Sequence, residues 1–466
     1  MACGCRSVYR DHAGLMRRTL FLTLLSLAVL WGVLGCRMRA EPAIEQAPAP
    51  LSSSPTPPSR PAHSTPPGPA QRILPALDRE PEVGVLLHRA PRIDLHLLGP
   101  AQVFGRAIPA GAVTVVVARS GLLINGQPVG SEAEFIVAVP AGQPAFSTTV
   151  QPPFGKAQSL RLEGRAVVRA VGAEVELIER LPMERYLTSV VSAEMNPTWP
   201  EAALAAQAIA ARSYASARWL ERFDQPWQLH WHYSVDMAYA GWRKPHPTID
   251  AAIARTRGEL LIIRGLPVQA LFHASSGGRT ESALRLKPHL IGPDGRTPVA
   301  DAMVPVDDPA AEAGAAGLKL SASHWRWKVD IPLAEVSADL QTWSRAQRGR
   351  PAIGTVVEVR PGERSAESRR VITVRVTHRH KGKMVHTELP STEFRLALSP
   401  VQVRSTWWDR CVIASAKGGT LVLEGRGFGH GVGLSQISAW QLAKQGVSPE
   451  DIVARFYAGA RIEKRW

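Results

Sequence analysis

The feature that most constrains the fold is residues 181–216, where a short apolar-periodic run leads through a proline-bearing turn into a long alanine-rich stretch. Leu187, Val190 and Val191 recur at helical spacing, which predicts a short helix ending near Glu194. Pro200 suits the first turn of a second helix that continues through the alanines. The sequence therefore predicts two helices in succession, joined by a rigid turn.

Glu194, at the end of the first predicted helix, is the candidate for acid–base chemistry. It lies beside Met195 and close to Trp199 in the sequence. Apolar neighbours desolvate a carboxyl group in part, and desolvation favours the protonated form that a general acid needs near neutral pH. The alternative is a solvated residue at a helix end, with no chemical role.

The charge balance points to a polyanionic partner. The chain has 466 residues, a formal net charge of +15 and a pI of about 10.2. This length has room for about two to three domains with a sizeable core. Nucleic acid, anionic lipid and an anionic wall polymer are the candidate partners. Nucleic acid is disfavoured, because the basic residues are scattered rather than clustered with aromatic ones and the chain opens with a secretion signal.

The N-terminal segment predicts export. Arg17-Arg18 precedes an uncharged apolar run over 20–35, which is short for a spanning helix of about 20 residues and fits the apolar part of a signal peptide. The run ends in Val33-Leu34-Gly35-Cys36, which resembles a bacterial lipobox with Cys36 as the lipid-bearing first mature residue. We therefore expect a signal peptide over 1–35 and an exported, membrane-anchored protein of the cell envelope. An uncleaved anchor is the alternative, and it too leaves the bulk of the chain outside the cytoplasm.

Cysteine usage agrees with this interpretation. The segment before Met16 is unusual for a signal peptide, and a start at Met16 in place of Met1 would put the two arginines directly after it. Cys3 and Cys5 would leave with the signal, so that Cys411 is the remaining cysteine that is free to pair. No intrachain disulfide is expected, and the chain is large enough to rely on a hydrophobic core.

The exported chain begins with a linker. Residues 36–85 are rich in Pro, Ser, Ala and Thr. This composition does not bury a core and behaves as an extended tether.

Short strands and then helices follow the linker. Residues 86–180 alternate as strands, with an Asn-Gly turn at Asn125, and predict an antiparallel sheet or small barrel. Helices dominate from about 183 to 222, and a helical region covers about 435–456, with mixed elements between them. The predicted class is α+β.

Two further motifs lie in the second half of the chain. One reads FHASSGGRTES over 272–282, and the other reads GRGFGHGVGLSQ over 425–436 and continues to FYAG at 456–459. Together with 181–216, they resemble the SpoIID/LytB family of bacterial cell-wall proteins, in content and in order. The resemblance covers most of the chain after residue 90.

The resemblance implies a catalytic core over 181–466 that acts on peptidoglycan. It implies a lytic transglycosylase that cleaves between N-acetylmuramic acid and N-acetylglucosamine, with a preference for strands stripped of peptides. Glu194 would protonate the leaving oxygen and then remove the proton of the muramic 6-hydroxyl as a 1,6-anhydro ring closes. Ordinary glycosidases use two carboxylates. Asp236 and Glu281 are the possible partner carboxylates, and participation of either would weaken the case for a mechanism that uses a single carboxylate.

Polar residues of the three motifs are the candidate substrate-binding groups. They comprise Gln207 and Arg212 in the central helix, His273, Ser275 and Ser276 in the second motif, and His430, Ser435 and Gln436 in the third. Arg212 is suited to hold the lactyl carboxylate of a muramic acid unit, and the alternative is a hydrogen bond from helix to sheet. His273 either binds substrate or orients Glu194, or it is packed at the end of a strand over 268–272. Neither Ser275 nor Ser435 lies in a nucleophile elbow, which argues against serine catalysis.

Glycines recur at every second position of the third motif, at 425, 427, 429, 431 and 433. The spacing fails the dinucleotide fingerprint, and no Gly-Lys-Ser/Thr phosphate loop follows. On a strand, such a pattern leaves one face bare, and a flat glycan chain can lie on it. The alternative is close packing against another strand.

Other functions remain open. Some members of the family are described as enhancers of a separate amidase, which would make this chain a wall-binding module with a structural Glu194. A wall-anchoring lipoprotein without activity is a third possibility. The predicted partners are accordingly peptidoglycan glycan strands, the membrane through a lipid anchor, and a cell-wall amidase, with no nucleic acid.

No metal or cofactor is expected. Some members of the family carry Cys and His ligands between the first and second motifs, but this chain has no cysteine there. His230 and His232 alone are weak support for a metal site.

Overall fold

The structure is a computed structural model that describes residues 76–152, 156–233, 235–286, 302–346, 349–414 and 418–466. The expected signal peptide, Cys36 and the linker up to residue 75 lie outside the described residues. The expected linker ends earlier than 85, because the first strand begins at Glu82. Leu77 is already buried, in a small cluster with Leu220, Leu260 and Ile262.

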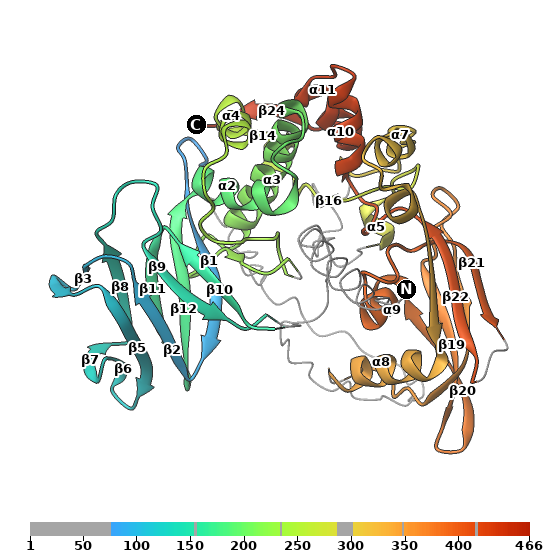
Figure 1. Ribbon diagram of the computed structural model, residues 1–466, viewed down its shortest axis with the longest axis horizontal. Helices are drawn as coiled ribbons and strands as arrows, with labels where there is room; N and C mark the ends of the chain where they lie inside the picture. The colour runs from blue at the N-terminus through green and yellow to red at the C-terminus, as the bar shows by residue number, and fades with distance from the viewer. Residues whose placement is uncertain (1–75, 153–155, 234, 287–301, 347–348, 415–417) are drawn as a thin grey trace, which may run out of the picture.

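Two antiparallel-rich sheets form the N-terminal part, at the left of Figure 1. The first has the spatial order β13 (Leu229–His230), β1 (Glu82–Ala90), β12 (Glu174–Pro182), β11 (Arg165–Val171), β8 (Glu132–Val137), β3 (Ala101–Val103) and β4 (Arg106–Ile108). The second has the order β10 (Gln158–Leu162), β9 (Phe146–Val150), β2 (Arg92–Leu97), β5 (Gly111–Ala118), β6 (Gly121–Ile124) and β7 (Gln127–Gly130). Alternate residues of each sheet, such as Ile93, Leu95 and Leu97 of β2, enter a shared core. This packing of two faces makes a β-sandwich.

The Asn-Gly hairpin is confirmed. Asn125 and Gly126 have φ of 50° and 80°, and β6 pairs with β7 in antiparallel register from Ile124 opposite Gln127. A two-residue turn with positive φ at both central positions matches the twist of the flanking strands. The Asn125 side chain also accepts a hydrogen bond from the backbone N–H of Thr114 at 2.9 Å.

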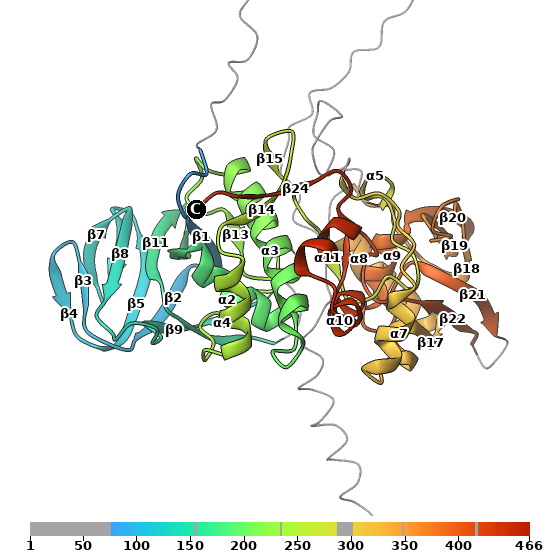
Figure 2. The ribbon, with the colours of Figure 1, turned by 90° about the horizontal axis from the view of Figure 1, so that it is seen from above.

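A helical layer packs against the sandwich and occupies the centre of Figures 1 and 2. It contains α2 (Met183–Glu194), α3 (Glu201–Glu221), α4 (Pro247–Arg255), α10 (Gln436–Lys444) and α11 (Pro449–Phe456), beside a small sheet of β15 (Leu266–Pro267), β14 (Glu259–Ile263) and β24 (Arg461–Lys464). The helix α3 contacts all the other helices of this layer and β14. Its alanines let these neighbours approach closely, so that α3 is buried on every side from Ala203 to Ser216.

A second hydrophobic core lies in the C-terminal half, at the right of Figure 1. It is formed by the sheet β17 (Arg326–Pro332), β22 (Thr420–Arg426) and β21 (Trp407–Ala414), the sheet β18 (Thr355–Pro361), β19 (Thr373–His380) and β20 (Lys383–Pro390), and the helices α8 (Leu333–Arg345) and α9 (Ser391–Leu398). The region 181–466, expected as the catalytic core, therefore contributes to two hydrophobic cores. These sheets and helices bury their apolar faces on one another, separately from the sandwich and α3. We call residues 326–426 the second unit, and the sandwich with its helical layer the first unit.

Short elements connect the two units. They are β16 (Phe272–His273), α5 (Ala283–Leu286), α7 (Ala310–Gly317), a π-helical turn η2 (Ser321–Trp325) and β23 (Leu434–Ser435). The helix α7 packs closely on α10, because Gly314 has no side chain to separate it from Ile437. Strands and helices are both abundant and the sheets are mainly antiparallel, which confirms the α+β class.

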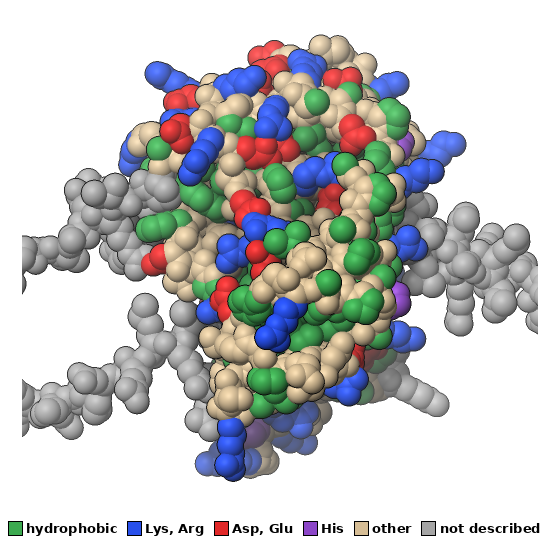
Figure 3. Space-filling model, turned by 90° about the vertical axis from the view of Figure 1, so that its left-hand side faces the viewer, with side chains coloured by type: hydrophobic (Ala, Val, Ile, Leu, Met, Phe, Trp, Pro, Cys, Tyr) green, Lys and Arg blue, Asp and Glu red, His purple; other side chains and the backbone are tan. Residues whose placement is uncertain are grey.

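The surface and the helices add two observations. The face of the sandwich in Figure 3 mixes Lys and Arg with Asp and Glu, without a single basic patch. Within the described ranges, no helix has the length and apolar character needed to cross a membrane.

Candidate active site around Glu194

Glu194 is the last residue of α2 and is only 8% exposed. Its Oε1 accepts a hydrogen bond from the backbone N–H of Ala238 at 3.0 Å. Burial raises the pKa of the Glu194 carboxyl to about 7, against the opposing effects of the Ala238 bond and of Gln436. A carboxyl group with this pKa is present in both protonation states at neutral pH, as a group that donates and then accepts a proton requires.

The raised pKa predicts a pH-dependent stability difference for Glu194→Gln. The folded state holds the proton more tightly than an unfolded carboxyl with a pKa of 4.5, so the wild type loses stability as pH rises from 4.5 through about 7. The glutamine side chain does not titrate, so the variant loses no stability over this pH range. Its amide oxygen can still accept the backbone N–H of Ala238. The variant should match the wild type at pH 4 and exceed it by up to about 3 kcal/mol at pH 8 in urea unfolding. An equal difference at both pH values would mean that Glu194 has an ordinary pKa.

Gln207 and Gln436 lie beside Glu194. Nε2 of Gln436 is 3.4 Å from the carbonyl oxygen of Glu194 and 3.5 Å from Oε1 of Gln207. Gln207 is buried, and its Nε2 has no hydrogen-bond partner among the described residues. The first motif, the central helix and the third motif therefore meet at one point, although they are far apart in the sequence.

The second and third motifs pair with each other. The strands β16 and β23 are parallel, with His273 opposite Ser435, and Ser275 and Phe428 exchange two backbone hydrogen bonds. Beyond the strands, Ile437 donates its N–H to the carbonyl of Ala274. This pairing fixes the position of Gln436 relative to the second motif.

His273 is buried where β16 ends. Its Nδ1 lies 3.0 Å from the carbonyl oxygen of Val432, so Nδ1 carries the proton of the neutral ring and Nε2 is a bare acceptor. Burial and Arg370 lower the pKa of His273 to about 3, which keeps the ring neutral. The ring of the half-buried His430 lies 5.5 Å from that of His273. These surroundings of His273 match the alternative prediction, a histidine packed at the end of a strand.

The three candidate serines, predicted to bind substrate, are fully buried in this structure. Oγ of Ser276 donates to Asp308 at 2.6 Å, and Oγ of Ser435 is 2.7 Å from Oγ of Ser438, which also contacts Asp308. Ser276 and Ser435 therefore belong to a buried hydrogen-bond cluster that joins the second and third motifs. The hydroxyl of Ser275 has no hydrogen-bond partner among the described residues.

The glycines of the third motif do not form a strand with a bare face. Only Gly425 lies on a strand, and the following glycines adopt positive φ: 75° at Gly427, 105° at Gly429, 81° at Gly431 and 70° at Gly433. A Cβ atom at Gly433 would lie 2.0 Å from the carbonyl oxygen of Leu271, and one at Gly429 would lie 2.8 Å from Cβ of His273. The alternative of close packing is correct, and the prediction of a glycan platform is wrong.

The surroundings of Arg212 favour its structural alternative over a contact with a muramic carboxylate. The side chain is 0% exposed, and its Nε and Nη2 donate to the two carboxylate oxygens of Glu184 at 3.0 and 2.7 Å. Nη1 also lies 3.3 Å from the carbonyl oxygen of Glu259 on β14. Arg212 therefore ties α3 to α2 and to the small sheet, as its structural alternative requires.

The two possible partner carboxylates are engaged away from Glu194. Asp236 accepts hydrogen bonds from Tyr214 and Arg218, at 2.9 and 3.1 Å. Glu281 is buried and accepts a hydrogen bond from Ser368. Among the described residues, no hydrogen bond or ion pair joins either group to Glu194.

The region between the first and second motifs offers little to a metal ion. Nδ1 of His230 accepts the backbone N–H of His232 at 3.0 Å, so this ring nitrogen is already engaged. In the part of the chain that the structure describes, no three His, Cys, Asp or Glu side chains gather as a metal site.

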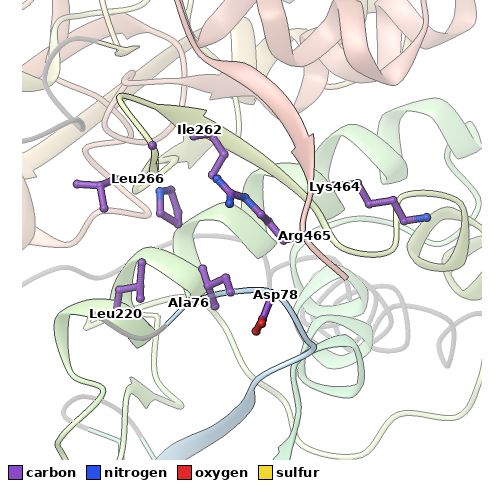
Figure 4. A pocket seen from close by; sticks show the side chains of 10 residues that line it. Ala76, Asp78, Leu220, Ile262, Leu266, Lys464 and Arg465 are labelled. Carbon is purple, nitrogen blue, oxygen red and sulfur yellow. The ribbon is translucent and has the colours of Figure 1, made fainter. Parts of the chain in front are cut away.

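A separate cavity of about 420 Å³ lies near the start of the described chain, as Figure 4 shows. Leu77, Leu220 and Ile262 line it together with Lys464 and Arg465. None of its lining residues belongs to the predicted site. The cavity is therefore not the meeting point of the three motifs.

Sequence reasoning missed three groups that shape the site. Ala238 acts through its backbone, and Asp308 and Arg370 lie outside the three motifs, so no motif marks them. Only the fold brings these residues to the motifs.

Comparisons with known proteins agree with this geometry. The family model described as stage II sporulation protein, SpoIID, matches residues 171–262, which include Glu194 and Gln207. Stage II sporulation protein D of Bacillus subtilis strain 168 is 26% identical over 303 residues, which cover 62% of this chain and 76% of that protein. These matches support the resemblance to the SpoIID/LytB family.

Other relatives match less of their own length. An uncharacterized protein of Brachyspira hyodysenteriae is 26% identical over 291 residues, which cover 61% of this chain and 68% of that protein. The amidase enhancer of Bacillus subtilis strain 168 is 22% identical over 294 residues, which cover 59% of this chain and only 40% of that protein. Residues 315–433 match a domain of unknown function, DUF8618, a range that includes the whole second unit.

Proposed function

We propose that this protein is a lytic transglycosylase of peptidoglycan glycan strands, with Glu194 as its one acid–base group. The observation that carries the proposal is the buried Glu194 carboxyl, whose pKa is raised to about 7 where the three motifs meet. The names of the relatives suggest a role related to the cell wall.

In the proposed reaction, Glu194 donates its proton to the oxygen that leaves with N-acetylglucosamine as the bond to C1 of N-acetylmuramic acid breaks. The resulting carboxylate takes the proton of the muramic C6 hydroxyl while that oxygen bonds to C1. A 1,6-anhydro ring forms, Glu194 regains its proton, and no water is consumed. Glycosidases that use water require a second carboxylate to activate it or to form a covalent intermediate. The engagement of Asp236 and Glu281 elsewhere supports a mechanism with one carboxylate.

Enhancement of an amidase is the second candidate function, and the match to the amidase enhancer favours it. Glu194 would then be structural, through its hydrogen bond with Ala238. Two incubations distinguish the two functions. One contains the protein with purified peptide-free glycan strands, and the other contains the protein with intact peptidoglycan and a purified amidase. We expect anhydro-muramic products from the glycan strands alone. No product from the strands, together with a faster amidase, would establish the second function.

We also propose export to the cell envelope and lipid attachment at Cys36, on the strength of the apolar run and the lipobox-like sequence before it. Cys36→Ala should move the protein from the membrane fraction to the soluble exported fraction. A variant that stays with the membrane as firmly as the wild type would instead indicate an uncleaved anchor.

A further inference from the structure

Arg370 belongs to the second unit, but its side chain contacts the second motif. It precedes β19 and is 0% exposed. Nη2 donates to the carbonyl oxygen of Ser276 at 2.5 Å and to that of Arg279 at 3.3 Å. Two carbonyls of the second motif are therefore held by one guanidinium from the second unit.

The third motif makes room for the same guanidinium. A Cβ atom at position 431 would lie 2.3 Å from Cζ of Arg370, and Gly431 has a φ of +81°. The carbonyl oxygen of Gly431 accepts the N–H of Glu281 at 2.8 Å, and the Glu281 carboxylate accepts from Ser368, two residues before Arg370. One loop of the second unit thus contacts both motifs.

A short series of contacts connects Arg370 to Glu194. The N–H of Ser276, whose carbonyl Arg370 holds, donates to Oγ of Ser435 at 3.3 Å. The next residue is Gln436, whose Nε2 lies 3.4 Å from the carbonyl oxygen of Glu194. A shift of the Ser276 turn therefore moves the residue that contacts the end of α2.

Part of the buried Arg370 guanidinium lacks hydrogen-bond partners among the described residues. Nε and Nη1 have no hydrogen-bond partner among the described residues, although the side chain is fully buried. A buried donor without a partner costs about 1–3 kcal/mol, and apolar replacement of buried ionic groups is often neutral or stabilising. Stability alone does not explain this arginine, which calls for another role.

We propose that Arg370 is a positioning residue for Glu194, and that the DUF8618-matching unit is a part of the catalytic apparatus rather than an independent binding domain. The expected effect of Arg370 on turnover rests on the proposed function. Its expected effect on the conformation of the second and third motifs does not.

The first test compares Arg370→Met with Arg370→Lys and a matched control in the full chain. Arg370→Met should lower kcat on glycan strands by up to about 100-fold, as small misplacements of a reacting group do, with KM and the melting temperature nearly unchanged. Arg370→Lys should recover most of the rate, because its ammonium still donates toward Ser276. The control is Arg350→Met, which removes another arginine of the second unit that donates to the carbonyl of Trp343 and to Glu393 and should keep the wild-type kcat.

The second test does not depend on turnover. Hydrogen exchange of the amides at 276–278 and 427–436 should be about tenfold faster in Arg370→Met, with β18 and β20 unchanged. Unchanged exchange at both segments would overturn the proposal, and so would faster exchange throughout the second unit with a lower melting temperature. If the wild type does not cleave glycan, the proposed function fails, and hydrogen exchange still decides whether Arg370 orders the two motifs.

Discussion

Glu194→Gln is expected to reduce cleavage of peptide-free glycan strands by about 10²- to 10⁴-fold, the usual loss when a general acid is removed. Glutamine keeps an oxygen for the N–H of Ala238, so the end of α2 should remain in place. The glutamine has no proton to give to the leaving oxygen, and the reaction stops at its first step. The measurement is kcat/KM on purified strands, with the melting temperature of each protein.

Glu179 provides a matched control. It is also buried with a pKa raised to about 7, but it lies on β12 and accepts hydrogen bonds from Tyr239 and Gly164. Glu179→Gln should therefore keep wild-type turnover. Equal losses of turnover in Glu194→Gln and Glu179→Gln would show that replacing any buried carboxyl lowers the activity. Wild-type turnover in Glu194→Gln, with unchanged melting, would rule out the catalytic assignment.

Arg212→Ala is expected to destabilise the protein by about 3–5 kcal/mol, because it leaves the Glu184 carboxylate buried without its cation. Glu184 would retain only single N–H donors from Gly258 and Trp466. The free energy of unfolding in urea measures the loss, and the affinity for glycan strands should be unchanged at a temperature where the variant is folded.

The control for this prediction is an exposed pair. Arg92 and Asp94 lie on the surface of the sandwich, where solvent screens an ion pair, so Arg92→Ala should leave the free energy of unfolding nearly unchanged. If Arg212→Ala is as stable as Arg92→Ala but binds glycan more weakly, Arg212 contacts substrate after all and the structural assignment is incorrect.

The sequence predicted those parts of the fold that local physics determines. The Asn125-Gly126 turn requires positive φ, which few residues other than Asn and Gly adopt readily, and it is present. The two helices around Pro200 are also present, because their apolar spacing and the proline at the second N-terminus are local signals. Glu194 was recognisable as a candidate, since its apolar neighbours are adjacent in the sequence.

The sequence could not predict which way Arg212 points. Helix α3 is buried on all sides, so no polar face distinguishes cleft from core, and Glu184 is a partner from another helix. The conformation of the glycines in the third motif was ambiguous for a similar reason. Period-two spacing fits both a flat strand and a loop of alternating positive φ, and the decisive neighbours of Gly429 and Gly431 are His273 and Arg370, distant in the chain.

The most direct test of the central claim is mass spectrometry of the products formed from peptide-free glycan strands in ¹⁸O-labelled water. A transglycosylase that closes the ring with the muramic 6-hydroxyl consumes no water. We therefore predict 1,6-anhydro-muramic ends without ¹⁸O from the wild type, and none from Glu194→Gln. Reducing ends that carry ¹⁸O would show hydrolysis, and strands left intact would show no cleavage; either result would contradict Glu194 as the single acid–base group of a lytic transglycosylase.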